Sequence, residues 1–107
     1  MSPLLTVTTT LTSESEARAL ARRALEDKLA ACAQIQAIQS LYTWDGALQE
    51  DNEWQVSFKT AKRRAKELIA FIEASHPYEV PQILITEISF ASEAYIAWVY
   101  ASTKAHD

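Results

Sequence analysis

The chain has 107 residues, a net charge of −4, one glycine and 49% hydrophobic residues. This length predicts one domain, and the composition is typical of a globular protein with little flexible linker. The negative charge argues against a general role on nucleic acids or anionic membranes. No apolar run reaches the ~20 residues of a membrane helix. We therefore expect a single domain over residues 1–107, with residues 1–3 and 103–107 flexible.

Two features predict a cytoplasmic location. The start, Met1-Ser2-Pro3, lacks the charged residues and the apolar block of a secretory signal. Cys32 is the only cysteine, so the chain cannot form an internal disulfide, as is typical of proteins in a reducing compartment.

The first two predicted elements are a strand and a helix. Residues 4–11 alternate between mainly apolar residues on one face and threonines on the other, which predicts a β-strand. Ser13 followed by Glu16 forms a capping-box pattern. Alanine and leucine then recur at helical spacing, so an amphipathic helix is expected from about residue 14 to residue 30.

Asp45-Gly46 is the strongest hairpin signal in the chain, and it separates strands predicted over about residues 32–44 and 47–59. A two-residue turn puts Trp44 opposite Ala47 and fixes the register of both strands. In that register three apolar pairs share one face: Ile35 with Val56, Ala33 with Phe58 and Ala37 with Trp54, while Gln34 faces Ser57 on the other. A slip of one residue would break every pair, so we predict a long, regular hairpin.

The end of this hairpin forms an arm that one small domain cannot cover. Tyr42 and Trp44 lie on one strand of the arm, opposite the acidic residues Glu50, Asp51 and Glu53. Exposed aromatic residues on a long strand pair favour association unless a partner covers them. We therefore interpret the arm as an oligomer contact.

A second helix is expected from about residue 61 to residue 75, with Thr60 as its cap. Lys59, Lys62, Arg63, Arg64 and Lys66 crowd its start. A basic helix start could hold an anion, but cations there gain nothing from the helix dipole. We expect a solvated face that acidic groups of a neighbour could pair.

The segment 75–81, with sequence Ser-His-Pro-Tyr-Glu-Val-Pro, follows this helix. Each proline fixes its own φ and biases the preceding residue to an extended conformation, so the segment should be stiff. A stiff connection that carries His76, Tyr78 and Glu79 is a candidate site. The alternative is a proline-terminated helix whose polar residues face water.

A fourth strand is predicted over residues 82–90, with a bulge near Thr86-Glu87 where the apolar phase changes. Ser92 then caps a final helix. The order of elements predicts an α+β fold of the ferredoxin-like, split-βαβ type: β-α-β-β-α-β plus a C-terminal helix, with a four-stranded antiparallel sheet. Two helices cover one face of such a sheet, so something else must cover the other face.

Several strings in this order resemble the CutA family of divalent-cation tolerance proteins over nearly the whole chain. They are residues 26–32 (EDKLAAC), 40–46 (SLYTWDG), 49–53 (QEDNE), 59–60 (KT), 76–81 (HPYEVP) and 95–98 (YIAW). No single string is specific by itself, but their order and spacing together are.

The resemblance implies a tight homotrimer of ferredoxin-like subunits, similar in architecture to the trimeric PII signalling proteins. In the family the sheets face one another around the threefold axis and the hairpins reach across to neighbours. The family is linked to tolerance of copper and other divalent metals, and its animal members to acetylcholinesterase anchoring. No enzymatic activity is established for it, so we predict that this protein is not an enzyme.

The chain departs from the family pattern at positions that concern metal binding. Some members offer copper a cysteine in the first strand and a second histidine before the Pro-Tyr pair. The matching positions here are Thr9 and Ser75, so only His76 remains of that set. The stretch around Ala37 is one residue shorter than usual and lacks the family's Pro-Gly-like break.

The candidate metal ligands are His76, Glu79 and Cys32, because imidazole, carboxylate and thiolate all bind divalent or monovalent metals. His106 lies in the expected flexible tail. We expect no required cofactor, with copper or another divalent cation as the ligand that the family implies. One histidine in each chain does not make a tight site, although a trimer could gather three copies of a ligand.

Other functions remain open at this point. Tyr42, Trp44, Lys59 and Tyr78 could line a subunit contact or a cleft for PII-like small-molecule sensing. A trimer that binds an unidentified protein partner without a metal site is a further alternative. His76 with Glu79 could do acid–base chemistry, but the chain has no nucleophile spacing or phosphate loop to support catalysis.

Overall fold

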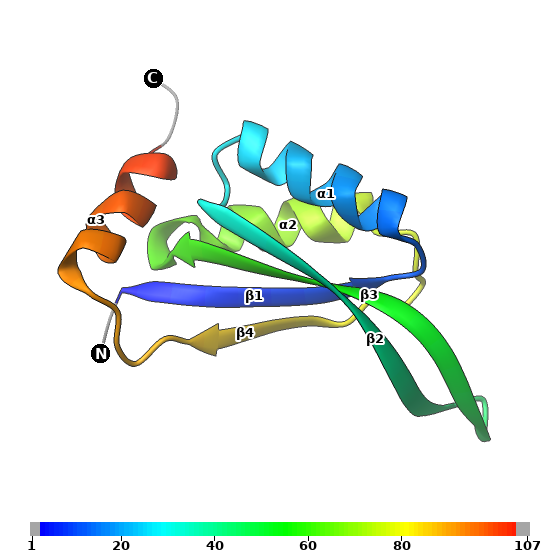
Figure 1. The fold of residues 1–107 in the computed structure, drawn as a ribbon. Coiled ribbons are helices and arrows are strands. Elements are labelled where there is room, and N and C mark those ends of the chain that lie inside the picture. The colour runs from blue at the N-terminus through cyan, green and yellow to red at the C-terminus, as the bar shows by residue number, and fades with distance from the viewer. Residues whose placement is uncertain (1–2, 105–107) are drawn as a thin grey trace.

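The computed structural model describes residues 3–104, and predictions about Met1, Ser2, His106 and the rest of residues 105–107 lie outside the described residues. Helices α1 and α2 lie on one face of a four-stranded sheet, and α3 packs at one end (Figure 1). The sheet order is β2-β3-β1-β4 and every neighbouring pair is antiparallel. This is the ferredoxin-like arrangement that the sequence predicts. In chain order the elements are β1 (Leu4–Leu11), α1 (Glu14–Glu26), β2 (Cys32–Trp44), β3 (Ala47–Ala61), a 3₁₀ turn (Lys62–Arg64), α2 (Ala65–Ser75), β4 (Ile83–Glu87) and α3 (Glu93–Ser102).

The β2–β3 hairpin has the predicted register over its whole length. Trp44 pairs with Ala47, and the predicted pairs of Ala33, Ile35 and Ala37 with Phe58, Val56 and Trp54 are all present, as is Gln34 with Ser57. Asp45 and Gly46 both have positive φ, 52° and 76°, as a two-residue hairpin turn of the primed type requires. The turn therefore sets the register, and the apolar pattern agrees with it.

The main core lies between the sheet and helices α1 and α2. Val7, Val56 and Phe58 are fully buried on the sheet side, as strand alternation predicts for residues on one face. The helix side is supplied by the apolar stripes of α1 and α2: Ala17, Leu20, Ala21 and Ala24 with Leu68 and Ile72. The small alanine stripe lets α1 lie close to the strands.

Helix α1 begins where the sequence predicts but ends four residues early, at Glu26. Ser13 caps its start by accepting the N–H of Glu16 at 3.2 Å. At its end Lys28 takes φ 58°, and the N–H groups of Lys28 and Leu29 return to the carbonyls of Leu25 and Ala24. This is a Schellman end, which usually carries glycine at the position of Lys28.

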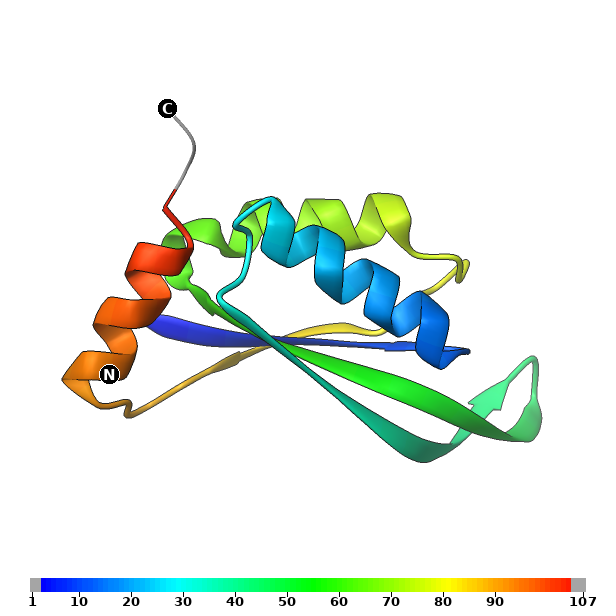
Figure 2. The same cartoon turned by 45° about the horizontal axis from the view of Figure 1, so that its top comes forward.

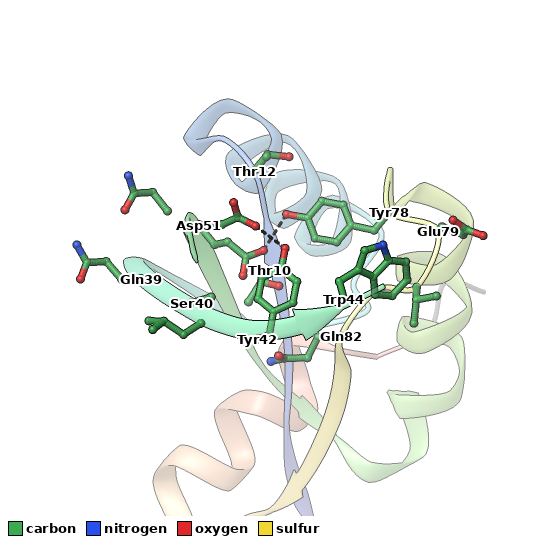
Figure 3. Close-up of a pocket in the computed structure, with 14 residues that line it drawn as sticks. Thr10, Thr12, Gln39, Ser40, Tyr42, Trp44, Asp51, Tyr78, Glu79 and Gln82 are labelled. Atoms are coloured by element: carbon green, nitrogen blue, oxygen red, sulfur yellow. Dashed lines mark hydrogen bonds between the residues drawn. The ribbon is translucent and has the colours of Figure 1, made fainter. Parts of the chain in front are cut away.

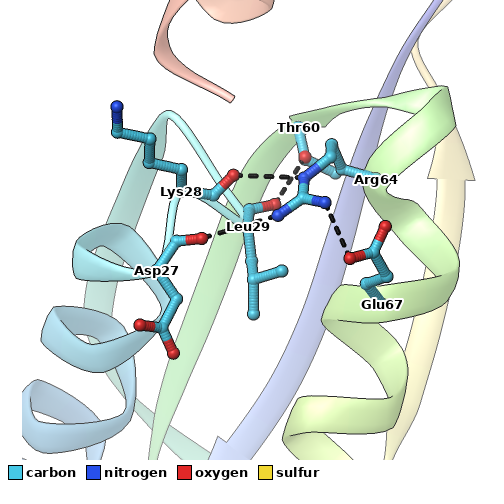
Figure 4. Close-up of polar contacts among 6 residues, drawn as sticks. All are labelled: Asp27, Lys28, Leu29, Thr60, Arg64 and Glu67. Atoms are coloured by element: carbon cyan, nitrogen blue, oxygen red, sulfur yellow. Dashed lines mark hydrogen bonds and ion pairs between the residues drawn. The ribbon is translucent and has the colours of Figure 1, made fainter. Parts of the chain in front are cut away.

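A buried arginine supports that early end. Arg64 is 7% exposed, and its guanidinium donates to the carbonyls of Lys28 (3.3 Å) and Asp27 (3.5 Å) and pairs with Glu67 at 2.7 Å (Figure 4). The carbonyls at a helix end have no partner within the helix. Arg64 therefore joins the end of α1 to the start of α2.

The start of the second helix differs from the prediction. Strand β3 continues to Ala61, and α2 begins only at Ala65 after the 3₁₀ turn. The Thr60 hydroxyl does not cap the helix but is buried and donates to the carbonyl of Leu29 at 2.7 Å (Figure 4). The prediction was wrong because this tertiary partner, 31 residues away in the sequence, takes the hydroxyl.

The basic residues at this helix start are only partly the solvated face that we expected. Lys62 and Lys66 are exposed, but Arg64 is buried. Arg63 donates to the carbonyl of Tyr100 at 2.9 Å and lies over the Tyr100 ring, 4.4 Å from its centre. Two of the arginines therefore serve tertiary packing.

Strand β4 is shorter than predicted and ends at Glu87. The change of apolar phase marks that end and not a bulge, because Ile88 packs into a second cluster with Leu4, Ala61 and Val99 of α3. Ser92 caps α3 as predicted, accepting the N–H of Tyr95 at 3.2 Å. Thr103, expected in a flexible tail, is buried and donates to the carbonyl of Val99 at 2.7 Å.

The hairpin arm extends beyond the sheet and past α1 and α2 (Figure 2). The molecule is accordingly 45 Å long, and its radius of gyration is 14.5 Å, compared with about 13 Å for a compact chain of this length. Large apolar side chains lie exposed on the arm and elsewhere, among them Leu48 (70% exposed) and Phe90 (81%). Of the residues described, no helix combines the length and the apolar character needed to cross a membrane.

Candidate functional site

An open cleft of about 800 Å³ lies where the arm leaves the sheet (Figure 3). One wall is the arm, built from β2 and β3, and the other is the proline-flanked segment between α2 and β4. The end of β1 contributes Thr10, and Thr12 follows it. The side chains with rings or charges that line the cleft are Tyr42, Trp44, Asp51, Glu53, Tyr78 and Glu79.

The hairpin register explains why the arm's polar side chains meet. Alternation places Ser40, Tyr42 and Trp44 of β2 on the same face as Asp51 and Glu53 of β3. Tyr42 pairs directly with Gln49, so Asp51 is its diagonal neighbour, which is within reach of a long side chain. The Tyr42 hydroxyl donates a hydrogen bond to the Asp51 carboxylate, and that bond is the main cause of the raised pKa of Tyr42.

A second tyrosine–carboxylate contact joins the two walls. The Tyr78 hydroxyl donates to the Glu53 carboxylate at 2.8 Å. Glu53 is only 9% exposed. Burial, together with the bond to Glu53, raises the pKa of Tyr78 to about 12, while a hydrogen bond with Thr12 acts in the opposite direction. Tyr78 therefore stays protonated and remains a donor at neutral pH.

His76 contacts Tyr78 but does not line the cleft. Its Nε2 is 2.9 Å from the carbonyl oxygen of Thr10 and 3.0 Å from the hydroxyl of Thr9, and its Nδ1 accepts the N–H of Tyr78 at 3.2 Å. A carbonyl accepts only, so Nε2 carries the proton and Nδ1 does not. The pKa of His76 is lowered, chiefly by burial, with the Thr10 carbonyl and the charges of Glu16 and Glu53 acting the other way.

The predicted site residues divide into two groups. Tyr42, Trp44, Tyr78 and Glu79 come together in the cleft. Lys59 and Cys32 do not join them, because they pair with each other across β2 and β3 where β2 begins, at the end far from the arm. Lys59 donates to the side chain of Gln34 at 3.1 Å. Cys32 lies near Tyr95 of α3; the pKa of Tyr95 is raised chiefly by burial and to a smaller extent by Cys32.

The structure also limits what one chain can offer a metal. Within residues 3–104, no three His, Cys, Asp or Glu side chains lie close enough together to hold a metal ion. Both ring nitrogens of His76 are engaged, so the imidazole does not fit a copper site in this arrangement. The assignments of Glu79 and Cys32 as ligands stay predictions.

Glu53 and Asp51 are the site residues that the sequence reasoning missed. The register already places Asp51 diagonal to Tyr42, so that contact was available from the sequence. Tyr78 and Glu53 are 25 residues apart and on different elements. No local pattern indicates that Glu53 is buried and paired with Tyr78.

The cleft is electronegative. Three carboxylates, those of Asp51, Glu53 and Glu79, line it, and none of its lining residues in the described part of the chain is Lys, Arg or His. Carboxylate and hydroxyl oxygens are ligands for hard cations, and a cleft of one charge sign concentrates ions of the opposite sign. The arrangement therefore favours cations over anions.

Comparisons with known proteins agree with this fold. A family model described as "CutA1 divalent ion tolerance protein" matches residues 5–102. The "Divalent-cation tolerance protein CutA" of Escherichia coli O139:H28 is 34% identical over 96 residues, which cover 89% of this chain and 86% of that protein.

Solved structures are similar over nearly their whole length. CutA from Synechococcus elongatus PCC7942 is 38% identical, with a TM-score of 0.94 over 97% of this chain and 93% of that one. The "Periplasmic divalent cation tolerance protein CutA" from Archaeoglobus fulgidus is 29% identical, with a TM-score of 0.92 over 94% and 99%. The match of the family model to residues 5–102 and the identity with the E. coli protein show that this chain belongs to the CutA family of divalent-cation tolerance proteins.

Proposed function

We propose that this protein acts in divalent-cation tolerance, without catalysis, as a cytoplasmic homotrimer that binds cations in the cleft beside its arm. The observation that carries the proposal is the cleft itself: carboxylates of Asp51, Glu53 and Glu79 line it without a basic side chain among its described residues. The names of the relatives favour this function over small-molecule sensing, or partner binding without a metal site.

A single chain supplies only part of a binding site. Since no three ligating side chains meet within residues 3–104, a tightly bound cation needs further ligands from a second chain. The arm is the element that can provide them, because it extends beyond its own sheet (Figure 2). Glu79 is exposed at the cleft, so its carboxylate is free to meet a shared ion.

The proposed trimer is supported by the exposed apolar surface. Leu41, Trp44 and Leu48 on the arm are 63%, 45% and 70% exposed. Monomeric proteins rarely leave large apolar patches in water. Light scattering should give a mass three times the 12.0 kDa of the chain. Leu48→Glu should lower that mass, and a variant that stays trimeric would contradict a role for the arm's tip.

Calorimetric titration with Cu²⁺, Zn²⁺ and Mg²⁺ tests the cleft. The wild-type protein should bind at least one of these ions saturably, in a fixed ratio to the trimer. Glu79→Gln and Asp51→Asn should each weaken binding about tenfold, which corresponds to ~1.4 kcal/mol and lies within the Coulomb energy of one charge near a protein surface.

Glu73→Gln is the matched control, because Glu73 is exposed on α2 and does not line the cleft. This variant removes the same charge from the chain and should bind as the wild type does. Equal weakening in all three variants would mean that net charge, and not the cleft, attracts the ion. Absence of saturable binding to an intact trimer would refute the proposed site.

A further inference from the structure

We propose that His76 is a positioning residue of the cleft and not a metal ligand: it fixes Tyr78 so that the phenol hydroxyl meets Glu53. The inference deepens the proposed function and rests on it for the binding experiment, whereas its geometric part is tested separately. Its evidence lies at three places: the Nε2 of the imidazole, the Nδ1 of the imidazole and the hydroxyl of Tyr78.

The first contact anchors His76 to β1. Its Nε2–H points at the Thr10 carbonyl oxygen, 2.9 Å away, and the Thr9 hydroxyl lies 3.0 Å from the same nitrogen. Thr9 is fully buried and Thr10 is 4% exposed. The anchor is therefore a central strand of the sheet, on which β3 and β4 pack from both sides.

The second contact connects His76 to the backbone of Tyr78. The Nδ1 lone pair accepts the N–H of Tyr78 at 3.2 Å, and the two rings meet edge-on, with centres 4.6 Å apart and planes at 65°. Pro77 lies between them and has a fixed φ. With one end held on β1 and few free torsions between, the backbone of Tyr78 has little freedom to move.

The third contact is the one that matters for a cation. Tyr78 donates to Glu53 at 2.8 Å, and Glu53 is 9% exposed. A buried carboxylate is stable in its ionised form only when hydrogen bonds replace the lost water. Tyr78 supplies such a bond, so the position of Tyr78 holds the Glu53 carboxylate in place at the cleft.

The same contacts leave no place for a metal on the imidazole. A metal bond needs a free lone pair on a ring nitrogen, but Nε2 carries a proton directed at Thr10 and the lone pair of Nδ1 receives the Tyr78 N–H. Binding a metal at either nitrogen would break one of the two links. The Thr9 hydroxyl also lies 3.0 Å from Nε2.

A double-mutant cycle on cation binding separates the two roles. Tyr78→Phe should weaken binding about tenfold, as is usual when a residue that orients a ligand is lost. His76→Asn keeps an acceptor near Tyr78, and His76→Gln keeps a donor near Thr10. Each should weaken binding by no more than Tyr78→Phe does, and neither should weaken it further in the Tyr78→Phe background.

Tyr42→Phe is the control partner, because its hydroxyl serves Asp51 and not Glu53. The effects of His76→Asn and Tyr42→Phe should multiply. If the effects of the His76 and Tyr78 substitutions also multiplied, His76 would contact the cation itself and the inference would be overturned.

Nitrogen NMR of the His76 ring tests the geometry without relying on cation binding. The expected spectrum shows a protonated Nε2 and an unprotonated Nδ1, and it keeps both signals in place when Zn²⁺ is added. A proton on Nδ1, or a Zn²⁺-dependent shift of either nitrogen like that of a metal ligand, would overturn the inference. If the wild-type protein bound no cation, the proposed function would fail and the NMR result would still decide the role of His76.

Discussion

Tyr78→Phe removes one oxygen atom and should destabilise the fold, because it leaves a buried carboxylate without its donor. Glu53 is 9% exposed and accepts the Tyr78 hydroxyl at 2.8 Å. The phenylalanine ring keeps the edge-on packing against His76. The change therefore isolates the hydrogen bond from the packing.

The size of the expected loss of stability follows from the charge of the hydrogen-bond acceptor, the Glu53 carboxylate. A hydrogen bond to a charged group contributes roughly 1.5–3 kcal/mol, and one between neutral groups about 1 kcal/mol. Since little water reaches Glu53, we expect the free energy of unfolding to fall by about 2 kcal/mol. In the Tyr78→Phe background, Glu53→Met should restore part of this loss, because no buried charge then remains.

Urea unfolding at one fixed protein concentration is the appropriate assay, since association contributes to the stability of an oligomer. The chain contains its own control in Tyr42, which makes the same type of bond to Asp51, but both residues are exposed. Water can replace that hydroxyl, so Tyr42→Phe should change stability much less. Equal losses in the two variants would refute the idea that burial of Glu53 makes its bond important.

Three further changes test other parts of the structure. Gly46→Ala should lower the free energy of unfolding in urea by about 1 kcal/mol, because Gly46 has a φ of +76°, which strains alanine even though nothing lies within 4 Å of the added Cβ. An unchanged unfolding midpoint would contradict this conformation of the turn. Arg64→Met should lower the free energy of unfolding by roughly 2–3 kcal/mol, because Arg64 is 7% exposed, pairs with Glu67 and donates to the end of α1. A loss smaller than that caused by Lys66→Met, at an exposed position, would contradict this role. The pKa of Tyr78 is raised to about 12 from 10, so its contribution to stability is present below pH 10 and lost as the pH rises toward 12. Tyrosinate absorbance should show ionisation that continues toward pH 12, and Tyr78→Phe should remove that last step.

The hairpin could be predicted to the residue because two independent signals agree there. Asp45-Gly46 fixes the turn, and the alternation of apolar residues along β2 and β3 permits only one register. The structure has the predicted pairs, such as Ile35 with Val56. Strand register is local information, so a single sequence carries it.

Element ends were predicted less well, because distant partners decide them. The end of α1 depends on Arg64, which lies 36 residues beyond Lys28. Thr60 is a good helix cap by residue type, but the carbonyl of Leu29 takes its hydroxyl. Neither partner is visible in a local pattern, so the sequence alone placed these boundaries wrongly.

The site was predicted in part for the same reason. Tyr42 and Trp44 were found from the arm, and Tyr78 and Glu79 from the stiff proline-flanked segment. Their meeting in one cleft depends on the segment crossing the end of β1, which only the fold shows. Glu53 looks like an ordinary strand carboxylate until Tyr78 reaches it.

In the proposed trimer, β3 would connect the subunit contact to the cleft. This strand carries Glu53 at the base of the arm and continues to the arm's tip at Ala47, so a neighbour that fixes the arm also fixes the carboxylate that meets Tyr78. Binding free energies that are linked in this way are reciprocal: if assembly strengthens cation binding, the cation strengthens assembly by the same factor. Dilution of the protein with and without Zn²⁺ should therefore shift the concentration at which the oligomer dissociates. An unchanged dissociation concentration at saturating Zn²⁺ would mean that the cleft is complete within one chain.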